Sequence, residues 1–347
     1  MSTISVDIET VRVRDALRSG LQHFRPALII AAACSAVLLF ALVPATTRIA
    51  AVQLDGLTIG LIRTTGAGLF AFPLLLILRM RPVRAPKDWG LLLLYAFGNF
   101  AAFPILFSLG IQRTSGSHAA LIMAVMPLFI GLIGMSLDRR LPRSSWFIGA
   151  TIAMVGEAAL VGIGHAGSST GATVAGDAIV FAACTMSAAG IVAGARLSSR
   201  MNPLAAALWA ITIAGAALAP LTAMRMVAAP YLFQGLTWTT CAAVLHITLG
   251  AAVLANVLLL WAVSRGGLVR VAPIQFIQPV CALFFASALL NEPLTASLLF
   301  VAAAIVFGTV TACRGARSNA PRKPILNAAV IFGQGKIIST TLARLAA

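Results

Sequence analysis

The chain has 347 residues, of which 60% are hydrophobic and 10% are charged, and its mean hydropathy is +0.98. Since soluble domains carry about 25% charged residues, this composition excludes a water-soluble globular protein. The formal charge is +16, but the basic residues stand between apolar runs rather than on one solvated face, so we expect no nucleic-acid partner.

Apolar runs of about 20 residues recur along the chain, and each is long enough to cross a bilayer as a helix. Barrel strands would instead alternate apolar and polar residues over about ten positions. The pattern predicts an all-α membrane protein with ten transmembrane helices, at residues 27–47, 57–79, 89–111, 117–137, 145–164, 176–195, 203–223, 239–262, 271–290 and 295–313.

The basic residues give an independent test of this number, because cytoplasmic loops hold the excess of Lys and Arg. With the N-terminus inside, 21 of the 25 basic residues fall in cytoplasmic segments, three fall in outside connections, and Arg63 lies within the second run. Removing one span would invert every later loop. The distribution therefore predicts ten spans with both termini in the cytoplasm.

An internal repeat divides the chain into two halves. Residues 121–129 and 138–142 parallel residues 274–279 and 291–295, at an offset of roughly 152 residues. Five spans separate the copies, and an odd number places them in opposite orientations, as in many secondary transporters that bind substrate near the midplane. The predicted organisation is a cytoplasmic N-terminal segment (1–26), a first repeat (27–164), a second repeat (176–313) and a basic cytoplasmic tail (314–347). The tail could contact anionic lipid or be disordered, and both alternatives stay open.

Three stretches also carry a family resemblance: Leu61 to Ala67, Thr114 to Ile122 with the following Pro127-Leu128-Phe129, and Gln278-Pro279-Val280 with Leu290 to Thr295. In this order they resemble the drug/metabolite transporter superfamily, in its bacterial branch built from two EamA repeats. The resemblance covers about residues 27–313. It implies a cell inner membrane protein in which helices 1–4 and 6–9 surround a central cavity and helices 5 and 10 are peripheral. It also implies alternating access, driven by a solute gradient or by protons.

The first-repeat turn departs from the family pattern, because Arg139 stands where the family usually has Glu. We therefore expect Asp138 and Glu292 to stabilise helix N-termini rather than to contact substrate.

Ionisable side chains at membrane depth are costly, so each is a functional candidate. Arg63 and Glu157 both fall in the outer half of the bilayer. They could form a charge pair; alternatively, Arg63 could contact an anionic substrate or extend to the interface, and Glu157 could couple transport to protons.

Polar side chains within the runs need hydrogen-bond partners in hydrocarbon. Asn99, Asn256, Gln275 and Gln278 could bind substrate or join neighbouring helices, and Gln275 and Gln278 share a helix face. His118 and His246 could each form a structural hydrogen bond or take part in a proton relay, and both roles stay open.

Phe100, Phe103 and Phe107 form one stripe on the third run. The stripe could face lipid, pack against helices or form a stacking wall for a flat or apolar solute. The sequence contains no HExxH zinc motif and no GxxxxGK[ST] phosphate loop, so we expect neither an enzyme nor an ATP-driven pump, and no metal or cofactor. The five cysteines stand singly and are expected to be small apolar residues rather than disulfides.

These observations predict a secondary transporter of a small organic metabolite or drug. We expect membrane lipid to surround the protein, and whether it forms a homodimer stays open. Export is the first expectation. The alternatives are a nutrient importer of the same fold, an intramembrane lipid-modifying enzyme, or a non-transporting receptor or scaffold.

Overall fold

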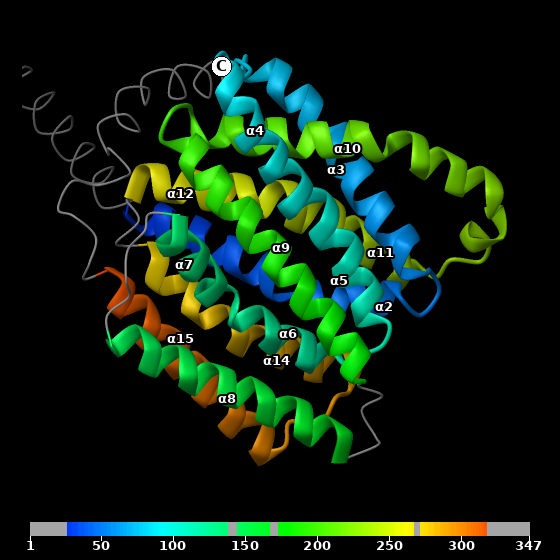
Figure 1. Cartoon of the computed structure of the whole chain (residues 1–347). Helices are drawn as coiled ribbons and strands as arrows, with labels where there is room; N and C mark the ends of the chain where they lie inside the picture. The colour runs from blue at the N-terminus through cyan, green and yellow to red at the C-terminus, as the bar shows by residue number, and fades with distance from the viewer. Residues whose placement is uncertain (1–25, 138–143, 167–172, 267–270, 318–347) are drawn as a thin grey trace, which may run out of the picture.

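The computed structural model describes residues 26–137, 144–166, 173–266 and 271–317, and every regular element in these ranges is helical (Figure 1). Residues 1–25, the turn with Asp138 and Arg139, and the tail beyond residue 317 lie outside the described residues. The expectations for those segments therefore stay predictions.

The first half begins with a helix over Pro26–Ala50, whose last part is α2 (Val43–Ala50). The elements that follow are α3 (Gly56–Ile77), α4 (Pro86–Tyr95), the π-helical segment η1 (Ala96–Ala102), α5 (Phe103–Ile111), α6 (Gly116–Ala124), α7 (Met126–Leu137) and α8 (Ser144–Ala166).

The second half runs from α9 to α15. Its elements are α9 (Val174–Ser198), α10 (Pro203–Ala228), the 3₁₀ turn η2 (Pro230–Phe233), α11 (Trp238–Leu245), the π-helical segment η3 (His246–Ala255), α12 (Asn256–Gly266), the 3₁₀ turn η4 (Ala272–Ile277), α14 (Gln278–Leu290) and α15 (Ala296–Arg317).

Seven continuous helices among the described residues are long and apolar enough to cross a membrane. They are Pro26–Ala50, Gly56–Ile77, Pro86–Ile111, Gly116–Leu137, Val174–Ser198, Pro203–Ala228 and Trp238–Gly266. Three shorter apolar helices, Ser144–Gly156, Gln278–Leu290 and Ala296–Ala312, fall on the other three expected runs. The predicted multi-pass helical membrane protein is thus confirmed.

Short polar side chains define where several helices begin. In each case the oxygen of the preceding residue accepts a hydrogen bond from a backbone N–H of the first turn, which has no partner within the helix. The residues that do so are Asp55, Ser115, Thr173, Asn202 and Thr237.

Hydropathy alone does not predict the interruptions inside the helices. The third helix of each half carries a π-helical segment, η1 in the first half and η3 in the second. The expected ninth span divides into η4 and α14, and Pro279 stands at the start of α14, where its missing N–H costs little. Segments of this kind often accompany functional sites.

Glycines allow helices from the two halves to approach closely. A Cβ atom added to Gly68 of α3 would lie 2.8 Å from the Cα of Gly215 in α10. A Cβ atom on Gly149 of α8 would lie 2.5 Å from the carbonyl oxygen of Gly308 in α15. Small residues at such crossings stabilise helix pairs in lipid through close backbone packing. In Figure 1, α8 and α15 lie side by side along one edge of the molecule.

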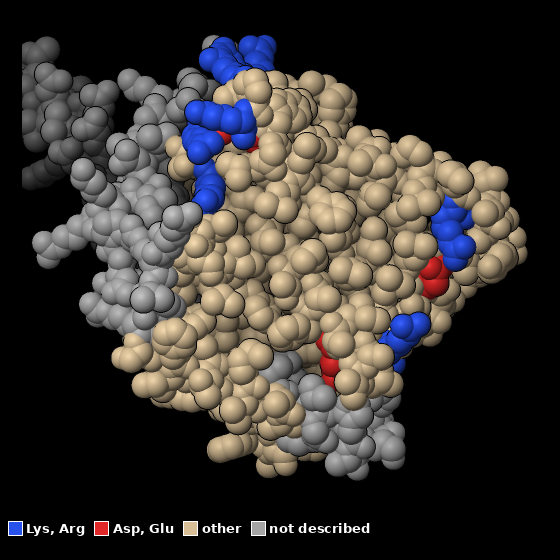
Figure 2. Space-filling view, in the orientation of Figure 1, with Lys and Arg blue, Asp and Glu red and all other residues tan. Residues whose placement is uncertain are grey.

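Charged side chains are unevenly distributed over the surface. Figure 2 shows Lys and Arg gathered toward opposite ends of the molecule, with a broad, nearly uncharged surface between them on this face. Large apolar side chains are exposed, including Leu69 at 71% and Phe300 at 78%. A surface of this kind fits a lipid surrounding.

Candidate functional site

A cavity of about 590 Å³ lies among the helices. Ligand pockets in proteins typically enclose about 300–1,000 Å³. Helices of both halves line it, from the Pro26–Ala50 helix and α3 to α14 and α15. Most lining side chains are apolar, and the polar ones are Arg63, Thr64, Tyr95, Asn99, Ser187, Asn256, Gln275, Gln278 and Thr309.

Seven of the eleven candidate residues that the sequence analysis names line this cavity. They are Arg63, Asn99, Phe100, Phe103, Asn256, Gln275 and Gln278. Phe107, His118 and His246 are not among the lining residues. The side chain of Glu157 is outside the described residues, so its pairing with Arg63 and its role in proton coupling stay predictions.

Arg63 is the charged residue among the described lining residues, and its side chain is 6% exposed. Its guanidinium carbon lies 5.4 Å from the centroid of the Phe103 ring, a cation–π distance. Its Nε and Nη1 atoms are buried and have no hydrogen-bond partner among the described residues. Arg63 therefore lines the cavity with hydrogen-bond donors that no described residue uses.

A polar pair connects the two halves at the cavity wall. The Ser187 hydroxyl on α9 donates to Oδ1 of Asn99 on η1 at 2.6 Å. Asn256, at the end of the other π-helical segment, donates from Nδ2 to the carbonyl oxygens of Ala251 and Ala252 at 3.2 and 3.0 Å. Each π-helical segment thus has an asparagine that is anchored beside the cavity.

Gln275 and Gln278 both face the cavity from the junction of η4 and α14. Residues three apart in a 3₁₀ turn lie on the same side, which agrees with the expected shared face. No hydrogen bond joins either side-chain amide to another described residue. Both amides are therefore able to bind a solute.

The aromatic stripe divides between two surroundings. Phe100 and Phe103 line the cavity, whereas Phe107 is fully buried in an apolar cluster with Val180 and Ala183 of α9. The centroid of the Phe107 ring lies 5.3 Å from the centroid of the Phe103 ring. The stacking-wall reading therefore applies only to Phe100 and Phe103.

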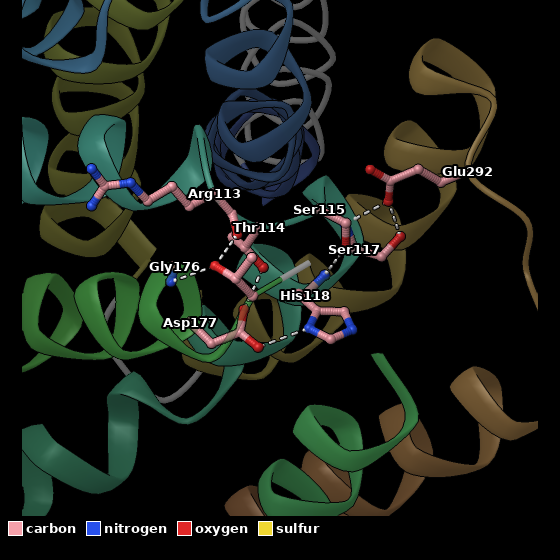
Figure 3. Close-up of polar contacts among 9 residues, drawn as sticks. Arg113, Thr114, Ser115, Ser117, His118, Gly176, Asp177 and Glu292 are labelled. Carbon is pink, nitrogen blue, oxygen red and sulfur yellow. Dashed lines mark hydrogen bonds and ion pairs between the residues drawn. The ribbon is translucent and has the colours of Figure 1, made fainter. Parts of the chain in front are cut away.

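His118 belongs to a second polar cluster, at the start of α6 (Figure 3). Its Nδ1 lies 3.0 Å from Oδ2 of Asp177 in the first turn of α9, and both side chains are 4% exposed. The hydroxyl of Thr114 donates to the other oxygen of Asp177. The hydrogen-bonded role that the sequence left open for His118 agrees with this geometry.

Glu292 reaches the same helix start from the turn after α14 (Figure 3). Its carboxylate accepts from the backbone N–H groups of Gly116 and Ser117 at 2.7 and 2.8 Å, and from the Ser117 hydroxyl at 2.5 Å. The carboxylate thus stabilises the N-terminus of α6, a helix of the other half, and not that of the following helix α15.

His246, the first residue of η3, contacts the first helix. Its Nδ1 is 3.0 Å from Oγ1 of Thr46, its Nε2 is buried without a described partner, and its ring interacts electrostatically with Arg63. Arg63 and His246 thus each have a buried side-chain nitrogen atom without a hydrogen-bond partner among the described residues.

Two further ion pairs connect the halves near the ends of the helices. Arg225 of α10 donates to Asp55, the cap of α3, at 3.0 Å, and Arg200 pairs with Asp88 of α4. Burial raises the pKa of Asp55, but hydrogen bonds from Thr58 and Arg225 outweigh burial and hold this pKa below its usual value of 3.8.

Tyr95, Ser187 and Asp177 are site residues that sequence reasoning missed. Tyr95 and Ser187 line the cavity, and Asp177 holds His118. The only signal for Asp177 was its place in the first turn of a helix, where carboxylates are common. No group of three or more metal-ligating side chains occurs among the described residues.

The chain is similar to a known protein family and to individual proteins. The EamA-like transporter family matches residues 27–162 and 174–313. The uncharacterized transporter YdeK of Bacillus subtilis (strain 168) is 28% identical over 286 residues, which cover 81% of this chain and 95% of that protein. The uncharacterized transporter sll0355 of Synechocystis sp. (strain ATCC 27184 / PCC 6803 / Kazusa) is 23% identical over 225 residues, or 60% of this chain and 66% of that protein. A solved structure titled "Crystal structure of protein" matches with a TM-score of 0.53 and 18% identity, over 84% of this chain and 99% of that one, and it supports the fold alone.

Proposed function

Because the chain belongs to the EamA-like transporter family, we propose that it is a secondary transporter that moves a small organic solute across the bacterial inner membrane. The observation that carries this proposal is the cavity between the halves, with polar side chains on an otherwise apolar wall. Such a wall gives a solute a few oriented hydrogen bonds within membrane depth.

We propose ten spans, with both termini in the cytoplasm. Seven long and three shorter apolar helices fall on the ten expected runs, and a short helix can be completed by the irregular turn that precedes it, as η4 precedes α14. The separation of basic residues along the sequence supports the orientation.

The two halves are proposed to be inverted repeats. Two features support this arrangement. The π-helical segments occupy the same place in the third helix of each half. The second helices of the halves, α3 and α10, pack on one another, and so do the fifth helices, α8 and α15. Equivalent helices that meet in pairs are the expected result of a two-fold relation between repeats.

Alternating access would follow from a rocking of one half against the other. The contacts from Glu292 and Asp177 to the start of α6 join the halves at the end assigned to the outside. The cavity lining extends away from that end, to Trp146 and Leu260. This arrangement corresponds to a state with the outer face closed, and opening would break those contacts. Export is our proposed direction.

The test is solute efflux from proteoliposomes that are loaded with a bacterial metabolite extract and analysed by mass spectrometry. We expect at least one solute to leave faster than from protein-free vesicles, and Gly131→Phe, which places a ring in the cavity, to stop the efflux. Gly134→Phe is the matched control on the same helix, because Gly134 does not line the cavity and an added Cβ atom there meets no described atom within 4 Å. Absence of any protein-dependent flux would overturn the proposed function. Equal flux with the two variants would show that the cavity is not the route.

A further inference from the structure

We infer that the cavity binds a small organic carboxylate, and that Arg63 holds the carboxylate group. This inference rests on the proposed transport function and specifies its substrate class. It starts from the electrostatic state of Arg63. A guanidinium stays charged in proteins, and a buried charge without a counterion is strongly disfavoured.

No described carboxylate neutralises Arg63. Asp55 and Asp88 pair with Arg225 and Arg200 near the helix ends. Asp177 and Glu292 are engaged at the start of α6. The described part of the chain therefore contains no counterion for Arg63, and an anionic ligand in the cavity would supply one.

The described surroundings of the guanidinium leave hydrogen-bond donors of Arg63 unused. The guanidinium carbon lies 5.4 Å from the centroid of the Phe103 ring, and neither buried nitrogen, Nε or Nη1, has a described partner. A planar guanidinium can bind a carboxylate through two parallel hydrogen bonds.

The rest of the cavity defines the body of the ligand. Arg63 is the cation among the described lining residues, so a singly charged carboxylate matches the site better than a phosphate dianion. The lining contains no described carboxylate to pair with an ammonium group. Phe100 and Phe103 offer an apolar wall, and the free amides of Gln275 and Gln278 offer hydrogen bonds. The predicted ligand is thus an uncompensated carboxylate on an apolar or aromatic body with one polar group.

The test compares three probes of similar shape on the purified protein: 4-hydroxybenzoate, 4-hydroxybenzamide and 4-hydroxybenzylamine. Binding is measured by calorimetry and by thermal shift, at pH values where the acid is ionised. We expect the carboxylate to bind about tenfold or more tightly than the neutral amide, and the cation not to bind.

Two variants of Arg63 test whether this residue binds the carboxylate group of the probe. Arg63→Gln is expected to abolish the preference for carboxylate over amide, and Arg63→Lys, which keeps the charge, to retain part of it. Arg225→Gln is the matched control, because Arg225 pairs with Asp55 and does not line the cavity. The comparison of probes on the unchanged protein remains decisive if Arg63→Gln does not fold.

Three results would overturn the inference. The amide could bind the unchanged protein as tightly as the carboxylate does. The Arg63→Gln variant could keep the preference. Alternatively, the unchanged protein could show no preference while Glu157→Gln gains one, which would identify Glu157 as the counterion of Arg63. In each case, metabolite efflux that Gly131→Phe stops would leave the proposed function standing. Without such efflux, the function itself fails.

Discussion

Single carboxylates add polar contacts between the two halves. Glu292 places both oxygens on the first turn of α6, where backbone N–H groups have no helical partner and the helix dipole favours negative charge. Hydrogen bonds to a charged group contribute about 1.5–3 kcal/mol to stability. The start of α6 should therefore respond to the charge of this one residue.

We expect Glu292→Gln to loosen the start of α6, because a neutral amide offers a single acceptor oxygen and no charge. Hydrogen exchange measured by mass spectrometry should be faster at the amides of residues 116–122, and the melting temperature should fall. Asp88→Asn, at the opposite end of the molecule, is the control and should leave these amides unchanged. Unaltered exchange in Glu292→Gln would show that the carboxylate does not hold α6.

The Asp55–Arg225 pair should make stability depend on pH. Because the folded protein holds the pKa of Asp55 below 3.8, this residue stabilises the fold above that pH, and the contribution is lost as the pH falls through the lower folded value. Asp55→Asn keeps an N-cap side chain but removes the charge. The melting temperature of the unchanged protein should exceed that of the variant well above pH 3.8, and the two values should converge below it. A difference that persists at low pH would contradict this assignment.

At the residue scale, the sequence predicted several side chains that line the cavity, but it did not predict the surroundings of every candidate. Polar residues in apolar runs must find partners or a cavity, which is why Asn99, Asn256, Gln275 and Gln278 were identifiable. Helical spacing placed Phe107 on the same stripe as Phe103, but spacing cannot say that α9 covers one end of that stripe. For His118, the decisive partner Asp177 is 59 residues away in the sequence.

At the scale of elements, some helix crossings require glycine, because the neighbouring helix leaves no room for a Cβ atom. Gly68 is such a position, because an added Cβ would lie 2.8 Å from backbone of α10. Backbone atoms cannot move aside as the end of a flexible side chain can, so the two helices would have to separate.

We expect Gly68→Ala to destabilise the protein by about 1–3 kcal/mol, the usual cost of overpacking. Gly90→Ala is the matched control, because nothing lies within 4 Å of its added Cβ. That change should be neutral or should stabilise α4 by up to about 1 kcal/mol through helix propensity. Chemical denaturation in detergent measures both, and equal effects of the two variants would contradict the packing argument.

The positions of the helices were predictable, whereas their internal irregularities were not. Apolar runs and the capping residues Asp55 and Ser115 indicate where helices lie and begin. The π-helical segments η1 and η3 depend on the hydrogen-bond register of the backbone, which hydropathy does not encode. In η3, the carbonyl groups of Ala251 and Ala252 accept from the Asn256 side chain, a contact that only the structure reveals.

For the whole molecule, the account requires two halves that move against each other around one cavity. The sequence supported this through the repeat at residues 121–142 and 274–295 and through the separation of basic residues. The cavity itself, about 590 Å³ in volume and lined by helices of both halves, follows only from how the helices pack.

The most direct test is to lock the closed outer end and to measure transport. In a variant whose five cysteines are replaced by alanine, Ser117→Cys and Glu292→Cys place two thiols at a contact that joins the halves. Solute flux through proteoliposomes is then measured before treatment with a short reversible thiol cross-linker, after it, and after reduction, with each single cysteine variant as a control. The account predicts that cross-linking stops flux in the double variant alone and that reduction restores it. Undiminished flux through the cross-linked protein would contradict alternating access between these halves.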